Sequence, residues 1–260
     1  MFYLFQLTLI TLITIVLSLV TTLVGIFDRF GKHAYVVNRL WTWLILRIGG
    51  ISLQVEGLQH IDPKQPYIFI VNHQSNVDIP VLVQALPKFQ LRWIAKKELL
   101  RMPFFGWAMW ATKHVTVDRS DPQDAVKSLQ RASERLAAGI SLVVYPEGTR
   151  SKDGNLQKFK KGGFLLAVQT KTAVVPVTVN GSGAVLPAGA WRIRPGLIKV
   201  TVEEPISVEG FRPGNLRLLL EQARAKIASH LSRPEQTESH SPLQPGAAIV
   251  SHRAMEKANL

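Results

Sequence analysis

The order of apolar and polar residues divides the chain into three parts. Residues 2–27 carry no charged side chain, and from about residue 54 short β-rich runs alternate with helical runs. Beyond residue 231 the chain is polar and contains several prolines, a composition that does not support a packed core. We therefore expect a membrane-attached helical segment at residues 1–53, an α/β domain at 54–231 and a disordered tail at 232–260.

The N-terminal run is long enough for a helix that crosses a hydrocarbon layer of about 30 Å. No Lys or Arg precedes it, which argues against a cleaved signal peptide. A second apolar stretch, 34–53, mixes Trp41 and Trp43 with two arginines, which is typical of an interfacial helix or a re-entrant hairpin partner. The basic residues that follow the first run place the domain on the cytoplasmic face of the cell (inner) membrane. The pattern fits a spanning helix and an embedded one equally.

The alternation in the middle of the chain predicts a single layered α/β domain with a central, mainly parallel or mixed sheet and flanking helices. Strands are expected at 67–72, 141–146, 173–181 and 197–206. Helices are expected at 121–139, 162–170 and 215–231. If the first two strands are parallel, the polar residues that follow each of them lie at one edge of the sheet, where ligands collect in open α/β sheets.

The first of these polar stretches holds a histidine and an aspartate five residues apart. His73 and Asp78 do not share a helix face at this spacing, but they meet if His73 lies in the turn and Asp78 in the first helical turn. Asp78 would then fix the imidazole tautomer and leave the other nitrogen as a general base. A helix cap made by Asp78, Ser75 or Asn76 explains the spacing at least as well. A metal site or a Ser75 nucleophile has less support, because neither a ligand cluster nor a G-x-S-x-G turn accompanies them.

The second polar stretch, YPEGTRS at 145–151, is suited to bind a phosphate. Gly148 permits a tight turn, and the loop amides, the Thr149 hydroxyl and the Arg150 guanidinium all donate hydrogen bonds. Four lysines follow, at positions 152, 158, 160 and 161. The plainer interpretation is a solvated charged loop in which Glu147 pairs with Arg150.

Residues 92–120 interleave aromatic residues with cations. This pattern suits stacking of single-stranded nucleic acid, contact with lipid headgroups, an acyl pocket or plain core packing. The formal net charge of +13 indicates an anionic partner, and the uncharged N-terminal run favours lipid over nucleic acid. The sequence contains no cysteine, which excludes a disulfide scaffold, thiolate metal sites and a cysteine nucleophile.

Four short motifs, in this order, resemble those of the glycerolipid acyltransferases, specifically the 1-acylglycerol-3-phosphate (lysophosphatidate) acyltransferases. They are Asn72-His73 through Asp78, Asp118-Arg119, Pro146 to Ser151, and Val175-Pro176-Val177. The resemblance covers roughly residues 70–180. Tyr145 stands where that family more usually has phenylalanine.

The resemblance implies transfer of a fatty acyl chain from acyl-CoA or acyl-carrier protein to the sn-2 hydroxyl of 1-acylglycerol-3-phosphate, giving phosphatidic acid. It implies that His73 is the general base, that Asp78 orients it, and that the hydroxyl attacks the thioester directly. The phosphate loop and its helpers would be Glu147 as organiser, Gly148, Thr149, Arg150, Arg119 and Lys96. Pro176 would be structural or would shape the acyl site. Neither a metal nor a cofactor is expected, since the acyl donor is a co-substrate.

Three other functions stay open at this point. The first is acyl transfer to a different acceptor, such as glycerol-3-phosphate, a lysophospholipid or a lyso-ornithine lipid. The second is non-catalytic binding of anionic lipid at a membrane, against which the His73 and Asp78 pair argues. Nucleic-acid binding is the third, and the uncharged N-terminal run argues against it. The motifs specify neither the acyl-chain length nor the oligomeric state.

Overall fold

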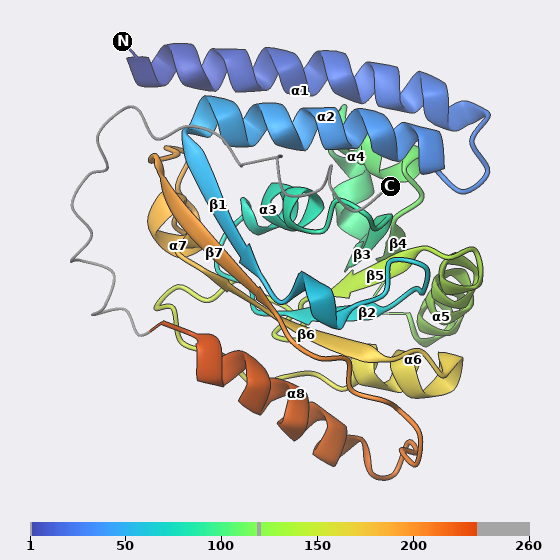
Figure 1. Ribbon diagram of the computed structural model, residues 1–260. Coiled ribbons are helices and arrows are strands. Elements are labelled where there is room, and N and C mark those ends of the chain that lie inside the picture. Colours follow the sequence, from blue (N-terminus) through green and yellow to red (C-terminus); the bar gives the residue numbers. More distant parts are fainter. Residues whose placement is uncertain (1, 119–120, 233–260) are drawn as a thin grey trace, which may run out of the picture.

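The computed structural model describes residues 2–118 and 121–232. In these residues a seven-stranded mixed sheet carries helices on both faces, which confirms the predicted layered α/β domain (Figure 1). The strand order is β1-β7-β6-β2-β5-β3-β4. All neighbouring pairs are parallel except β6 and β7, which are antiparallel. Arg119 and the expected tail from residue 233 onward lie outside the described residues.

The strands are β1 (Ile51–Glu56), β2 (Ile68–Val71), β3 (Leu91–Lys96), β4 (Val115–Val117), β5 (Ser141–Val144), β6 (Val174–Asn180) and β7 (Gly196–Val202). The α-helices are α1 (Phe2–Ile26), α2 (Lys32–Gly49), α3 (Asp78–Ala85), α4 (Phe105–Ala111), α5 (Pro122–Ala137), α6 (Gly162–Thr170), α7 (Ser182–Val185) and α8 (Leu216–His230). Two short 3₁₀ helices are η1 (Leu58–His60) and η2 (Lys97–Arg101). Strand β1 begins three residues before residue 54, where the domain was expected to start. Strands β1, β3 and β4 are additions to the predicted set.

Two hydrophobic cores, one on each face of the sheet, hold the helices in place. Phe69 of β2 points into the core formed with α2 and α3, and the neighbouring Ile68 points into the core formed with α5, α6 and α8. Both β2 and β5 are buried along their whole length, which explains their continuous apolar sequence. Helix α3 follows β2 onto one face and α6 follows β5 onto the other. Such a divergence of connections opens a crevice at the carboxyl ends of two neighbouring strands.

Helices α1 and α2 form a hairpin that covers the α3 side of the domain, with α1 outermost (Figure 1). Among the described residues one helix, Tyr3–Ile26, is long and apolar enough to cross a membrane, with a mean hydropathy of 2.5. Many of its apolar side chains are exposed, including Phe5 and Leu23. Helix α1 therefore presents an uncharged apolar surface along one side of the molecule.

A buried arginine ties the turn of this hairpin to the sheet. The guanidinium of Arg92, on β3, donates hydrogen bonds to the carbonyl oxygens of Phe30 at 3.0 Å and Gly31 at 2.8 Å. It also lies 4.9 Å from the centre of the Tyr35 ring. Burial lowers the pKa of Arg92 to about 10, so the side chain keeps its charge at neutral pH. The buried cation is thus held by carbonyl dipoles and an aromatic face, while its Nε has no hydrogen-bond partner among the described residues.

Candidate active site

The carboxyl end of β2 carries a histidine that is oriented by a buried carboxylate. His73 lies in the turn after β2, and its Nδ1 is 2.8 Å from Oδ2 of Asp78, the first residue of α3. The same oxygen accepts the backbone N–H groups of Gln74 and Ser75, each at 2.9 Å. Because an ionised carboxylate only accepts hydrogen bonds, Nδ1 carries the imidazole proton and Nε2 keeps a lone pair. Asp78 therefore braces the turn and orients the imidazole at once, so the two interpretations of the spacing are not exclusive.

The Ser75 side chain holds this turn together through hydrogen bonds. It is fully buried, and its hydroxyl donates a 2.6 Å hydrogen bond to the carbonyl oxygen of Leu186. The same hydroxyl oxygen accepts the backbone N–H of Val77 at 3.2 Å. A hydroxyl that is buried and bonded on both sides is not placed to act as a nucleophile.

Tyr145, the first residue after β5, covers one face of the imidazole. The ring centres of His73 and Tyr145 are 3.8 Å apart and the planes differ by 9°. Trp93 Nε1 donates to the Tyr145 hydroxyl at 3.4 Å, which holds the tyrosine from the far end. The stack fixes the plane of the base, and burial raises the pKa of Tyr145 well above its ordinary value, so the phenol stays neutral. Sequence reasoning noted the aromatic residue here but missed its contact with His73.

Glu147 joins the two polar stretches. Its buried carboxylate accepts the backbone N–H of His73 at 2.8 Å through Oε1 and that of Gln157 at 2.9 Å through Oε2. In return, the backbone N–H of Ser151 donates to the carbonyl oxygen of His73 at 2.7 Å. Burial raises the pKa of Glu147, while the two N–H donors lower it. Glu147 thus bonds to the backbone of both polar stretches, and no ion pair joins it to Arg150 among the described residues.

Asn72 anchors the turn to the other neighbouring strand. Its amide donates to the carbonyl oxygen of Val179 at 2.9 Å and accepts the Val179 N–H at 2.8 Å. The side chain of Asn72 thereby bonds both backbone groups of Val179 in β6, as a neighbouring strand would. Its role was not predicted, because it depends on which strand lies beside β2.

Gly148, Thr149 and Arg150 lie beside His73 and form the open part of the site. Gly148 has a φ of 76°, and a Cβ there would lie 2.7 Å from Nζ of Lys160, so only glycine fits without a shift. The Thr149 hydroxyl donates to Gln157 Oε1 at 3.1 Å. Within the described part of the chain, the Arg150 guanidinium has neither a hydrogen bond nor an ion pair. Among the described residues it is thus a cation without a partner, and it lines the same cavity as His73.

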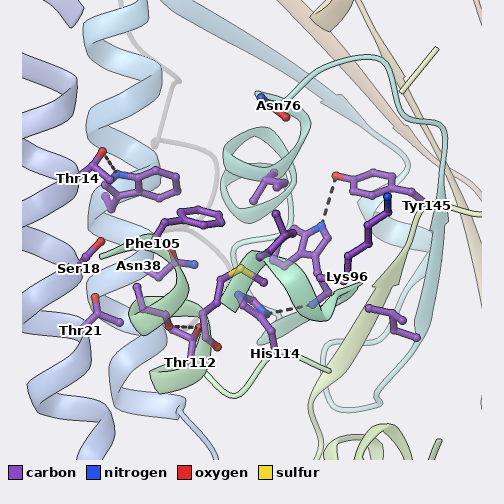
Figure 2. Close-up of a pocket in the computed structure, with 18 of the residues that line it drawn as sticks. Thr14, Ser18, Thr21, Asn38, Asn76, Lys96, Phe105, Thr112, His114 and Tyr145 are labelled. Carbon is purple, nitrogen blue, oxygen red and sulfur yellow. Dashed lines mark hydrogen bonds between the residues drawn. The ribbon is translucent and has the colours of Figure 1, made fainter. Parts of the chain in front are cut away.

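These residues line one cavity of about 400 Å³ between the hairpin and the sheet, called here the main cavity (Figure 2). Figure 2 shows Thr14, Ser18 and Thr21 on its α1 side and Lys96 and Tyr145 on its sheet side. Its wall also contains His73, Arg150, Trp93 and His114. Burial lowers the pKa of His114 to about 3, so this histidine is neutral, and its Nδ1 accepts the backbone N–H of Trp93 at 3.2 Å. The main cavity is apolar over most of its wall and cationic at the end near the base.

The remaining predicted site residues have different fates. Lys96 lines the main cavity. Pro176 is buried in β6, opposite Ile70 of β2, and is not among the residues that line the main cavity. Arg119 lies outside the described residues. In the described ranges, no three His, Asp or Glu side chains gather in a way that could hold a metal ion.

Known proteins resemble this chain over most of its length. Residues 52–180 match the Acyltransferase family. The 1-acyl-sn-glycerol-3-phosphate acyltransferase of Pseudomonas aeruginosa is 33% identical over 228 residues, which cover 85% of this chain and 86% of that protein. This chain therefore belongs to the Acyltransferase family.

A plant protein and a bacterial crystal structure are also similar to this chain. The chloroplast 1-acyl-sn-glycerol-3-phosphate acyltransferase LPAT1 of Arabidopsis thaliana is 34% identical over 209 residues, and the match covers 79% of this chain but only 56% of the plant protein. The chain thus spans little more than half of that relative. The crystal structure of the 1-acyl-sn-glycerophosphate (LPA) acyltransferase PlsC from Thermotoga maritima superposes with a TM-score of 0.72 at 26% identity, covering 89% of this chain and 95% of that one.

Proposed function

We propose that this protein is a 1-acylglycerol-3-phosphate O-acyltransferase. It would transfer a fatty acyl chain from acyl-CoA or acyl-carrier protein to the sn-2 hydroxyl of lysophosphatidate, giving phosphatidic acid. The observation that carries the proposal is that one cavity holds both His73, oriented by Asp78 at 2.8 Å, and Arg150, whose guanidinium has no partner among the described residues. The names of the relatives from Pseudomonas aeruginosa and Arabidopsis thaliana support this choice of acceptor.

The proposed chemistry is direct transfer between the two substrates. Nε2 of His73 takes the proton from the sn-2 hydroxyl while the hydroxyl oxygen attacks the thioester carbonyl carbon. The tetrahedral intermediate collapses with cleavage of the C–S bond, and the leaving thiolate receives the proton that His73 returns. Asp78 stabilises the imidazolium that exists between these two steps. General base catalysis of this kind contributes about 10²–10⁴-fold to a rate.

The substrate phosphate would bind to the cationic end of the main cavity. Arg150 offers a planar pair of donors that matches two phosphate oxygens. Gly148, Thr149 and Lys96 line the same region and would add backbone, hydroxyl and ammonium donors. Arg119 is assigned here on the motif resemblance alone. Phosphate bound at Arg150 would hold the sn-2 hydroxyl near His73, because only a short glycerol backbone separates the two groups.

The apolar hairpin fits an enzyme that meets its lipid substrate at a bilayer. Helix α1 is uncharged and exposed, and the main cavity lies between the hairpin and the sheet. We infer that the protein is attached to the cell inner membrane, with the catalytic domain on the cytoplasmic face where acyl donors are made soluble by their carriers. The net charge of +13 would draw anionic lysolipid and an acidic carrier toward it.

An acceptor panel tests this function. The purified protein is given lysophosphatidate, glycerol-3-phosphate, lysophosphatidylcholine or lyso-ornithine lipid, each with acyl-CoA and with acyl-carrier protein. We expect phosphatidic acid from lysophosphatidate, and loss of that activity in His73→Ala with folding and membrane binding intact. Full activity of His73→Ala would refute the mechanism, and preference for another acceptor would refute the substrate assignment.

A further inference from the structure

Helix α4 has two apolar faces that serve different surroundings. Phe105, Ala108 and Met109 lie on its inner face and line the main cavity. Trp107 and Trp110 lie on its outer face and are 45% and 50% exposed, and Met102, just before the helix, is 49% exposed. We call Met102, Trp107 and Trp110 the tryptophan face. The sequence suggested an acyl pocket and a lipid headgroup layer as alternatives for this segment. The inner face is placed for the first and the outer face for the second.

The surroundings of the tryptophan face are cationic. Lys113 Nζ lies 4.0 Å from the centre of the Trp110 ring, and Arg101 is exposed at the end of η2. Lys97 is also exposed, close to Asp118 at 3.8 Å, and Glu98 is the one carboxylate between residues 96 and 113. Tryptophan combines a large apolar ring with one N–H donor, so it is favoured where hydrocarbon meets polar headgroups. Ammonium and guanidinium groups beside it suit lipid phosphates.

Helix α4 is also fixed against the apolar hairpin. A Cβ added to Gly25 of α1 would lie 2.5 Å from Cβ of Ala111, so the two helices approach closely at that point. Gly31 in the hairpin turn is packed in the same way against the backbone of Thr112. Figure 1 shows α4 beneath the end of the hairpin where α1 turns into α2. The tryptophan face therefore belongs to a helix that packs directly against α1, whose own apolar side chains are exposed.

We propose that the tryptophan face is a second lipid-contact surface, which binds the headgroup layer of an anionic bilayer beside the hairpin. Helix α4 would then be the wall between the bilayer and the main cavity, and lysophosphatidate would pass along it without exposing its acyl chain to water. This role rests on the proposed function. The contact itself does not, because binding of lipid by Trp107 and Trp110 is measurable without catalysis.

The test compares Trp107→Ser/Trp110→Ser with the control Val126→Ser/Leu218→Ser, both in the full-length protein reconstituted into vesicles of phosphatidylcholine and phosphatidylglycerol. Val126 and Leu218 are 69% and 57% exposed and belong to α5 and α8, on the other face of the sheet from the hairpin. The first measurement is quenching of tryptophan fluorescence by lipids brominated near the headgroup. We expect the quenched emission to fall in the Trp107→Ser/Trp110→Ser protein and not in the control. Equal quenching in all three proteins would overturn the contact.

The second measurement separates bilayer access from catalysis. For long-chain lysophosphatidate in vesicles, we expect KM to be about tenfold higher in Trp107→Ser/Trp110→Ser than in the unaltered protein, in keeping with the loss of two aromatic contacts. For hexanoyl lysophosphatidate, which is monomeric in water, KM and kcat should stay unchanged. Trp107→Phe/Trp110→Phe should restore the vesicle KM, because it keeps apolar rings at both positions.

Each other result has a defined meaning. An equal loss with the hexanoyl acceptor would reduce α4 to a cavity wall and overturn the lipid contact. A rise confined to the KM of acyl-carrier protein would make the tryptophan face a protein-binding surface, which also contradicts the proposal. If the unaltered protein acylates no lysophosphatidate, the proposed function fails, and the quenching measurement still decides whether Trp107 and Trp110 touch lipid.

Discussion

The two halves of the proposed active site are built in different ways. On the base side, Nδ1, the backbone N–H and the backbone C=O of His73 all have protein partners at 2.7–2.8 Å. On the phosphate side, the Arg150 guanidinium has no partner among the described residues. A base must be oriented before the substrate arrives, because its tautomer decides whether it can accept a proton. A cation that binds a substrate anion does not need a protein partner beforehand. A protein carboxylate in the same place would compete with the substrate for that cation.

The sharpest way to break the base side is Asp78→Asn, which removes the charge but keeps the shape. Because Nδ1 of His73 and the N–H groups of Gln74 and Ser75 all meet the same oxygen, an asparagine oxygen in that place keeps the three hydrogen bonds. The negative charge that would stabilise the imidazolium is lost, so kcat should fall about 10²–10⁴-fold with little change in Tm. Steady-state kinetics and calorimetry measure both quantities. A large drop in Tm with kcat preserved would mean that Asp78 only braces the turn.

Glu147→Gln should disturb the hydrogen bonds that link the two halves, because Glu147 accepts the backbone N–H groups of His73 and Gln157. Glutamine has one carbonyl oxygen for two N–H donors, so one of His73 N–H and Gln157 N–H would face an NH₂ group. We expect a loss of about 1–3 kcal/mol in the free energy of unfolding, and about a 100-fold loss of kcat from displacement of the base. Glu209→Gln, at an exposed position, makes the same charge change and is the matched control. Equal effects of both variants would contradict a joining role.

Arg150→Ala should affect the open half alone. Charge-assisted hydrogen bonds contribute about 1.5–3 kcal/mol each, so the KM for lysophosphatidate should rise at least about tenfold while the KM for the acyl donor stays the same. Lys152→Ala removes the same charge two residues away, in a side chain that lines a different hollow, and serves as control. An effect of Arg150→Ala confined to the acyl donor would refute the phosphate role and would remove the contrast between the halves.

Tyr145 offers the mildest test, because a stack restricts the imidazole without bonding to it. Tyr145→Phe keeps the ring and loses the 3.4 Å bond from Trp93, so kcat should change by no more than about twofold. Tyr145→Leu also loses the stack, which corresponds to about 2–10-fold in kcat. We therefore expect kcat to decrease from the unaltered protein to Tyr145→Phe and then to Tyr145→Leu. If Tyr145→Phe loses as much as Tyr145→Leu, the hydroxyl matters more than the ring face.

The sequence predicted those features that depend on short stretches of chain. The apolar run at 68–71 followed by polar residues predicted a buried strand that ends at a site, and β2 and β5 do lie side by side and parallel. The contact of His73 with Asp78 spans five residues, so local turn geometry was enough to suggest it. The helices at 122–137, 162–170 and 216–230 were marked by their periodicity and by the residues at their ends.

What the sequence did not predict depends on partners far along the chain. Asn72 bonds to Val179, Tyr145 stacks on His73, and Glu147 binds the backbone of His73, and all three require the order of strands β5, β2 and β6 to be known. Strand β3 escaped detection because Arg92 occupies a buried position where the apolar pattern calls for a hydrophobic residue. Its partners, the carbonyls of the hairpin turn, are about 60 residues away.

That arginine has a mechanical consequence. By holding Phe30 and Gly31 to β3, Arg92 joins the hairpin to the strand that leads directly into Lys96 and the cavity wall. The position of the hairpin is therefore coupled through Arg92 to that of the crevice that holds His73. For a protein attached to a bilayer through this hairpin, the depth at which α1 settles in the lipid sets the height of His73 above the headgroups. Bilayer thickness and lipid packing would thereby become variables in where along a lysolipid the base comes to rest.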